Sequence, residues 1–170
     1  MPVTGAGALV TVGSRRTATY PRGMNVDPNE PACSIHRSLQ IFGERWTLLI
    51  LREISLGQHR FAGLRDNLRI APNLLSARLR MLVDEGVLEQ REYRDPGSRV
   101  RHGYYFTRSG RELRLIFVAL QQWGDEYRPR PAGPSVVRRS RTTGRPVRAA
   151  LVDDRGAEIP LRDVRFVRSQ

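Results

Sequence analysis

Apolar residues in the first half of the chain recur every three to four positions, which is the spacing of one face of an α-helix. Ile35, Leu39 and Phe42 begin the pattern, and Gly43 ends its first segment. The pattern predicts four helices, over residues 32–43, 46–55, 61–68 and 72–85. The second of these is apolar on nearly every side, which is typical of a helix at the centre of a core.

After residue 86 the pattern changes to that of strands. Residues 87–94 and 100–106 are rich in Val and Tyr, and the Asp95-Pro96-Gly97-Ser98 segment between them is typical of a turn. These residues predict a β-hairpin. Thr107 is then expected to cap a single long helix, on which apolar residues recur every three or four positions up to residue 127.

The two ends of the chain lack this helical periodicity. Residues 1–31 are rich in Gly, Thr, Pro and Arg and are interpreted as a flexible arm. Residues 128–170 hold 11 arginines and four acidic residues. Alternation over 147–152, a turn at 153–156 and an apolar run up to Phe166 predict a small β-hairpin in this basic C-terminal extension.

Composition narrows the classes of protein to consider. The chain has 29 basic residues, all of them arginine, against 17 acidic ones, and its net charge of +12 favours a polyanionic partner. No run of about 18 to 20 apolar residues is present, so we expect no membrane span, and without a basic leader segment we expect a cytoplasmic protein. A single cysteine and three histidines exclude a disulfide scaffold and a zinc finger.

The order of the expected elements predicts the fold. Four helices, a basic hairpin and a closing helix over residues 32–127 indicate a mainly α protein with a small β-hairpin, arranged as a winged helix-turn-helix. In this architecture the helix over 72–85 enters the major groove of duplex DNA, and the hairpin contacts the backbone or the minor groove. The function predicted from this fold is therefore DNA binding.

Residue types on the expected DNA-facing surface match that role. In the helix over 72–85, leucines line one stripe and polar residues a different one, so the polar stripe is expected to face outward. Asn and Arg can form bidentate hydrogen bonds with adenine and guanine edges, Ser can contact either base, and hairpin arginines can neutralise phosphates. The residues expected to contact DNA are Arg60, Pro72, Asn73, Ser76, Arg80, Arg94, Arg99 and Arg101.

Several separated motifs lie between residues 32 and 127: CSIHRSL at 33–39, GERWTLLILRE at 43–53, RF at 60–61, LSARL at 75–79, GVL at 86–88, YYFT at 104–107 with Gly110, and Leu120 with Trp123-Gly124. Together they resemble the signature of the HxlR-type transcriptional regulators. The resemblance implies a dimeric winged-helix protein that represses or activates nearby genes, commonly in response to oxidants or electrophiles. We expect a repressor.

The helix that ends near residue 127 carries more apolar side chains than a small trihelical core can cover, which favours a homodimer. Resemblance to the HxlR-type family implies the same interface, because its members dimerise through the first and last helices of the domain. The residues expected in this interface are Ile35, Leu39, Ile116, Leu120, Trp123 and Tyr127. The DNA partner is then expected to be a pseudo-palindromic operator.

Cys33 is the only candidate for a redox or electrophile sensor. In several family members a cysteine at this position has that role, and a helix N-terminus with His36 and Arg37 nearby would stabilise a thiolate. The alternative is a small apolar residue that packs in the dimer interface. Cys33 and His36 alone fall short of the four ligands of a structural zinc site, so we expect no metal and no cofactor.

An enzyme and a general nucleic-acid-binding protein are two other classes of function to consider for this chain. No phosphate-binding, dinucleotide-binding or nucleophile-elbow motif is present, so we expect no enzyme. A general basic protein that binds RNA or the nucleoid is compatible with the charge, and it remains the alternative to a specific regulator.

The tails of some relatives carry cysteine pairs resembling a zinc ribbon. This tail has none, so it must fold without metal, and its charge indicates auxiliary, sequence-independent DNA contact.

Overall fold

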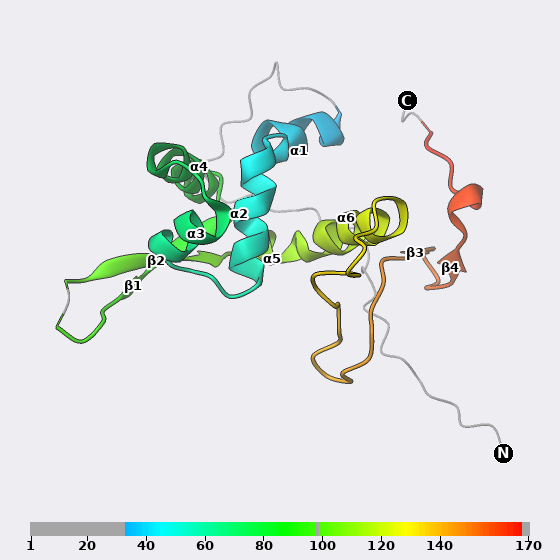
Figure 1. The fold of residues 1–170 in the computed structure, drawn as a ribbon. Helices are drawn as coiled ribbons and strands as arrows, with labels where there is room; N and C mark the ends of the chain where they lie inside the picture. Colours follow the sequence, from blue (N-terminus) through cyan, green and yellow to red (C-terminus); the bar gives the residue numbers. More distant parts are fainter. Residues whose placement is uncertain (1–32, 98, 168–170) are drawn as a thin grey trace. The chain divides into compact units, whose positions relative to one another are not determined.

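The computed structural model describes residues 33–97 and 99–167. They belong to two compact units, a helical unit that extends to Gly133 and a C-terminal unit from Pro134 onward (Figure 1). The predicted arm over residues 1–31 lies outside the described residues. None of the helices in the described part of the chain is long and apolar enough to cross a membrane.

The helical unit begins with four helices that lie where the periodicity predicts them. They are α1 (Ser34–Phe42), α2 (Arg45–Ser55), α3 (Phe61–Leu68) and α4 (Pro72–Asp84), each end within two residues of the prediction. Pro72 occupies the first turn of α4, where its missing N–H leaves no hydrogen bond unmade. A three-residue turn joins α3 to α4, which is the helix-turn-helix arrangement.

The predicted hairpin is confirmed as strands β1 (Leu88–Tyr93) and β2 (Arg101–Phe106), which pair antiparallel from Leu88 opposite Phe106 to Tyr93 opposite Arg101. The segment before α3 adds a short third partner, which the sequence did not indicate. The Tyr104 N–H donates to the His59 carbonyl (2.9 Å), and residue 60 bridges to Gly103. These backbone contacts anchor the hairpin to the start of α3.

The prediction of one long helix after Thr107 is wrong, because two helices are present, α5 (Arg108–Glu112) and α6 (Arg114–Tyr127). The predicted cap is confirmed, since the Thr107 hydroxyl accepts from the Gly110 N–H (3.2 Å). Gly110 lies so close to the hairpin that a Cβ there would be 2.2 Å from the Val87 carbonyl oxygen. Leu113 then donates to the Gly110 carbonyl, three residues back, and this tighter turn separates α5 from α6.

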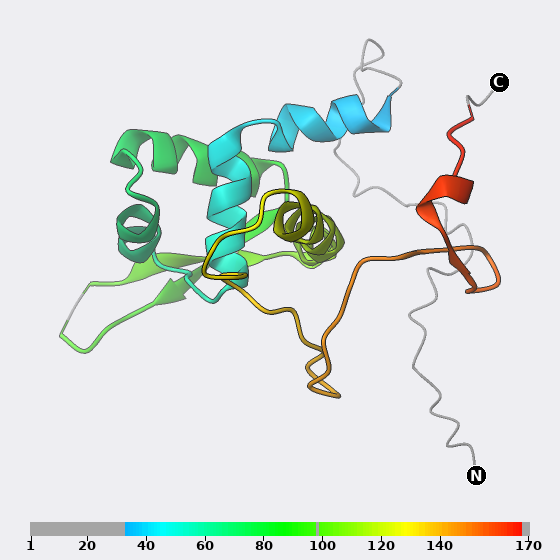
Figure 2. The ribbon, with the colours of Figure 1, turned by 45° about the vertical axis from the view of Figure 1, so that its right-hand side comes forward.

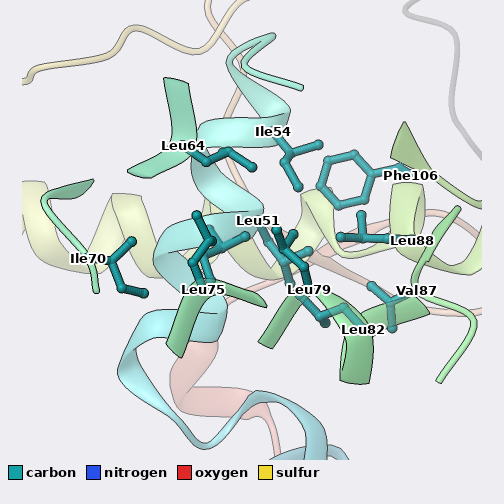
Figure 3. Close-up of a cluster of buried hydrophobic side chains, with 11 residues drawn as sticks. Leu51, Ile54, Leu64, Ile70, Leu75, Leu79, Leu82, Val87, Leu88 and Phe106 are labelled. Carbon is teal, nitrogen blue, oxygen red and sulfur yellow. The ribbon is translucent and has the colours of Figure 1, made fainter. Parts of the chain in front are cut away.

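One hydrophobic core holds the helical unit together (Figure 3). The side chains converge from α2, α3, α4 and both strands, and burial of each stabilises the fold by about 1.5–3 kcal/mol. Because Leu75, Leu79 and Leu82 of α4 are fully buried, the opposite face of that helix points away from the core. The buried apolar residues are Ile50, Leu51, Ile54, Leu64, Ile70, Leu75, Leu79, Leu82, Val87, Leu88 and Phe106.

A buried carboxylate joins α2 to α3 at the edge of this core. Glu53 accepts hydrogen bonds from the Arg52 guanidinium (2.6 Å) and from the Asn67 side-chain amide (2.8 Å). Burial of a charge is costly unless it is paired and hydrogen-bonded, and Glu53 meets both conditions. These bonds therefore fix the position of α3, the first helix of the helix-turn-helix, relative to α2.

The C-terminal unit contains the predicted small hairpin, with strands β3 (Leu151–Val152) and β4 (Glu158–Ile159). The Asp153 carboxylate holds the turn by accepting from the Arg155 N–H (2.9 Å) and the Ala157 N–H (2.8 Å). The apolar run beyond Ile159 does not extend the strand, because Pro160 begins a short 3-10 helix, η1 (Leu161–Asp163). No residue of 134–167 is buried.

Candidate nucleic-acid interface

The outward face of α4 carries the predicted polar stripe. Asn73 and Arg80 are exposed and Ser76 is half-buried, as expected from the burial of the leucines on the opposite face. The Arg80 guanidinium forms no ion pair or side-chain hydrogen bond within the described residues. It is therefore available to contact a ligand, and its planar group suits guanine edges and phosphates alike.

Asn73 has a local partner that the sequence pattern did not reveal. Its side-chain oxygen accepts from the backbone N–H of Leu74 (2.9 Å) in the first turn of α4. Bidentate contact with adenine uses both the oxygen and the amide NH₂ of an Asn side chain. In this arrangement the NH₂ group and the second lone pair of the oxygen remain available for a base or a phosphate.

Arg69, in the turn between α3 and α4, was missed by the sequence reasoning. It ends α3 in the left-handed conformation, with φ of 51°, and its backbone N–H donates to the Arg65 carbonyl. Ile70 follows as a buried residue, so the turn is anchored beneath an exposed arginine. A glycine at this position would have signalled the turn; the arginine gave no such signal. Its exposure and place beside α4 make it a candidate phosphate contact.

The hairpin presents exposed arginines, and one of its carboxylates is paired on its own strand. Arg94, Arg99 and Arg101 are exposed. On β1, the Glu89 carboxylate pairs with Arg91 (2.5 Å), and Glu92 lies 3.9 Å from the His102 imidazole. The ion pair with Arg91 reduces the negative potential of Glu89, and three exposed arginines lie at or near the tip.

Arg60 was predicted to contact DNA, but the structure places it in a two-point ion pair with Asp95 near the hairpin tip. The two guanidinium nitrogens donate to the two carboxylate oxygens at 3.1 and 2.9 Å, and the guanidinium also lies over the Tyr93 ring at 4.5 Å. This contact joins the start of α3 to the far end of the hairpin. It also neutralises Asp95, which reduces the negative potential near the hairpin tip.

The helix-turn-helix and the hairpin share one side of the helical unit. In two views turned by 45°, α3, α4 and the tip of the hairpin lie on one side of α2, and α6 lies on the other (Figures 1 and 2). The exposed polar stripe of α4 and the hairpin arginines can thus meet one elongated anion together. Duplex DNA, with a phosphate charge every 1.7 Å of its axis, is such an anion.

A separate apolar surface runs along α1 and α6. Ile35, Leu39, Leu120, Trp123 and Tyr127 are half or more exposed. A hollow of about 400 Å³ lies between the two helices and is lined almost entirely by carbon. The apolar residues that line it are Ile35, Leu39, Phe42, Leu48, Leu113, Ile116, Phe117 and Leu120. Exposed apolar patches of this kind mark surfaces that bind another protein, a membrane or an apolar ligand.

Cys33 lies at the N-cap position of α1 and is exposed, which is the placement that the sequence predicts. Its carbonyl accepts from the Arg37 N–H, and the Arg37 guanidinium donates to the Ser34 hydroxyl (3.0 Å). That contact holds a positive charge on the first turn of the helix. In the described part of the chain no group of three or more His, Cys, Asp or Glu side chains is arranged to hold a metal.

Comparison with known proteins shows the family of this chain. The HxlR-like helix-turn-helix family model matches residues 41–132. Mb3122 of Mycobacterium bovis, an uncharacterized HTH-type transcriptional regulator, is 47% identical over 133 residues, covering 77% of this chain and 82% of that protein. Rv3095 of Mycobacterium tuberculosis, also an uncharacterized HTH-type regulator, is similar to the same extent.

Solved structures show the same similarity. PA1607, a candidate transcription factor, has a TM-score of 0.70 at 32% identity, covering 82% of this chain and 97% of that one. PA1374 from Pseudomonas aeruginosa, also a candidate transcription factor, has a TM-score of 0.54 at 36% identity, covering 81% and 92%. The winged helix-turn-helix predicted from the sequence is thereby confirmed.

Proposed function

Because the chain belongs to the HxlR-like helix-turn-helix family of transcriptional regulators, we propose that it is a homodimeric repressor that binds a pseudo-palindromic operator in duplex DNA. The observation that carries this proposal is the exposed polar stripe of α4, on the same side of α2 as the arginine-bearing tip of the hairpin. One element supplies side chains that read bases, and the other supplies side chains that bind phosphates.

In this mechanism α4 lies in the major groove. Arg80 contacts a guanine edge, while Asn73 and Ser76 contact bases or phosphates near the start of the helix. Arg99 and Arg101 bind phosphates beside the groove, and the Arg60 ion pair with Asp95 keeps the hairpin in position for this. In a dimer the two α4 helices enter successive major grooves about 34–36 Å apart.

The direct test is fluorescence anisotropy with DNA from the chain's own upstream region and with random duplex, each at two salt concentrations. We expect the upstream DNA to bind at least about 10³ times more tightly than random duplex at physiological salt. Equal affinities that vanish together as salt rises would contradict a specific regulator, and would favour the general nucleic-acid binder.

Two arginine variants separate base reading from phosphate binding. Arg80→Ala is expected to cost about 1–3 kcal/mol on the operator and to relax specificity at one base position. Arg99→Ala should weaken binding to all sequences alike and flatten the salt dependence. Equal losses on operator and random DNA for Arg80→Ala would remove that residue from the base-reading set.

The proposed dimer interface is the apolar surface of α1 and α6. Ile116, Leu120 and Trp123 lie on one stripe of α6, and burial of such exposed apolar area against a second copy is favourable. Light scattering after size exclusion should give a dimer for the wild type and a monomer for Leu120→Asp with Trp123→Asp. Leu115→Asp is the matched control, because Leu115 is exposed on α6 but lies off the stripe of Ile116, Leu120 and Trp123. A folded dimer in the double variant would contradict the interface.

We also propose that modification of Cys33 changes the affinity for DNA. Its exposure allows a reagent to reach the thiol, and its place at the start of α1, inside the proposed interface, would let a modification shift one protomer relative to the other. Two Cys33 thiols that form a disulfide across the dimer give two electrons and two protons to the oxidant. An electrophile such as methylglyoxal would instead add to the thiolate.

Cys33→Ser tests the sensor. Anisotropy should show that diamide or methylglyoxal releases the wild type from its operator and leaves the serine variant bound. Release of both proteins to the same extent would assign the response to another residue. Loss of the dimer on serine substitution without any reagent would support the alternative, that Cys33 is a packing residue.

A further inference from the structure

Charge is unevenly distributed within the C-terminal unit. Residues 134–152 contain five arginines and no carboxylate, whereas residues 153–167 contain three arginines and four carboxylates. The second segment also pairs its charges, because Arg162 lies 3.8 Å from Asp163. The positive potential of the unit therefore comes from the first segment, and within it from the arginines at 138, 139, 141 and 145.

These four arginines lie on a loop with a defined backbone, residues 138–147, which we call the arginine loop. The Ser140 N–H donates to the Arg145 carbonyl (2.8 Å), and the Val147 N–H donates to the Arg138 carbonyl (3.1 Å). Gly144 has φ of +68°, a conformation that L side chains rarely adopt, and it allows the chain to reverse. The loop is therefore shaped by its own hydrogen bonds and not by burial.

Side chains of the loop reinforce this shape. The Arg139 guanidinium donates to the Gly144 carbonyl (3.0 Å), and the Ser140 hydroxyl accepts from the Thr143 N–H (3.1 Å). Arg141 and Arg145 have exposed guanidinium groups with no carboxylate partner in the described part of the chain. By contrast, Arg148, just outside the loop, is paired with Glu158. The loop thus holds Arg141 and Arg145, without carboxylate partners in the described part of the chain, on a backbone fixed by hydrogen bonds.

We propose that the arginine loop binds phosphates of the duplex DNA on which the helical unit sits, an inference that rests on the proposed function. An arginine side chain matches a phosphate with two parallel hydrogen bonds. The loop has no aromatic residue, and single-stranded nucleic acid is usually held by stacking on aromatic side chains. Its contacts are with the backbone of duplex DNA and carry no sequence information.

The test uses the full-length protein carrying Arg141→Ala with Arg145→Ala. The matched control is Arg155→Ala with Arg165→Ala, which removes the same charge from exposed positions in the other segment. Anisotropy is measured over a range of salt on operator duplex extended by about one helical turn, 10 base pairs, on each side. The magnitude of the negative slope of log Kobs against log salt should decrease by about 1.8 for the loop variant, since each lost phosphate contact accounts for about 0.9.

The control variant should leave this slope close to the wild-type value, and the operator-to-random ratio should be unchanged in both. Arg141→Lys with Arg145→Lys keeps the charge and should restore the slope, which excludes a folding defect as the cause. Equal slopes for the loop variant and the control would overturn the proposal, as would preferential capture of single-stranded RNA by the loop. If the wild type shows no operator preference, the proposed function fails, whereas the salt slope still tests the loop.

Discussion

The helical unit and the C-terminal unit are stabilised by different kinds of interaction. The helical unit has a core of eleven buried apolar residues drawn from three helices, their connecting segments and two strands. The C-terminal unit has no buried residue in 134–167, and its strands are two residues long. Its shape depends on turns in which Ser140 and Asp153 accept backbone hydrogen bonds. One unit is stabilised by contacts distant in sequence and the other by local ones.

This difference matches the two tasks that we assign to the units. Base reading requires a side chain to be held within a fraction of an ångström, so it needs a helix locked on a core. Phosphate binding by arginine tolerates small displacements and gives no sequence information. A locally ordered unit is sufficient for phosphate binding. Such a unit is expected to unfold locally at a low free-energy cost, because it has few buried contacts.

The largest effect expected to sharpen this comparison is in the core. Leu79→Ala should reduce the free energy of unfolding by about 2–5 kcal/mol, because the Leu79 side chain is fully buried where α4 packs on the core. Leu161→Ala, at a leucine of the C-terminal unit that is 77% exposed, should change it by less than about 0.5 kcal/mol. Urea unfolding followed by circular dichroism measures both. A comparable loss for Leu161→Ala would show that the C-terminal unit has a core of its own.

The sequence was most informative where burial repeats with a fixed period. Leucines at 75, 79 and 82 defined both the inner face of α4 and, by exclusion, the outer face that carries Arg80. Thr107 likewise identified a helix start, because its cap is a local interaction. Periodicity and caps depend on residues near one another in the chain, so a single sequence reveals them.

Features that join distant segments were not indicated by the sequence. The Arg60 ion pair with Asp95 spans 35 residues, and no local pattern distinguishes a paired arginine from one that meets DNA. The break at Leu113 depends on Gly110 packing against the carbonyl of Val87, a contact between elements. Arg69 has a left-handed backbone because the turn requires it, although its residue type favours neither a turn nor positive φ.

The next largest effect should separate stability from binding in the helical unit. Arg69→Gly should raise the free energy of unfolding by about 1 kcal/mol, because glycine removes the cost of a left-handed backbone at φ of 51°. If the arginine contacts a phosphate, the same change should weaken DNA binding. The magnitude of the slope of log Kobs against log salt should then decrease by about 0.9. Arg69→Asn is the control, since Asn also tolerates this conformation and lacks the charge. Unchanged affinity in both variants would remove Arg69 from the interface.

A smaller effect is expected at the ion pair that links α3 to the hairpin. Both side chains are more than a third exposed, so a double-mutant cycle with Arg60→Ala and Asp95→Ala should give a coupling of only about 0.2–1 kcal/mol. Hydrogen exchange should nevertheless accelerate at the hairpin tip in Asp95→Asn. Glu89→Gln is the matched control, because Glu89 pairs with Arg91 on the same strand and joins no distant segments. Equal acceleration in both variants would show that the Arg60 contact does not position the hairpin.

The smallest effect concerns the ion pair that closes the β3–β4 hairpin. A hydrogen bond from the Arg148 guanidinium holds the pKa of Glu158 below its ordinary value. A carboxylate with a lowered folded-state pKa contributes stability that is present above its unfolded-state pKa and is lost as pH falls through the folded-state pKa. Titration of the Glu158 side chain by NMR should therefore give a midpoint below that of an ordinary glutamate, and Arg148→Ala should return it to that range. Because Glu158 is exposed and lies outside the core, the hairpin resonances should shift on acidification while those of the buried core of the helical unit stay unchanged. Simultaneous loss of both sets of resonances would mean that the two units unfold as one, contrary to the division between a packed unit and a locally ordered one.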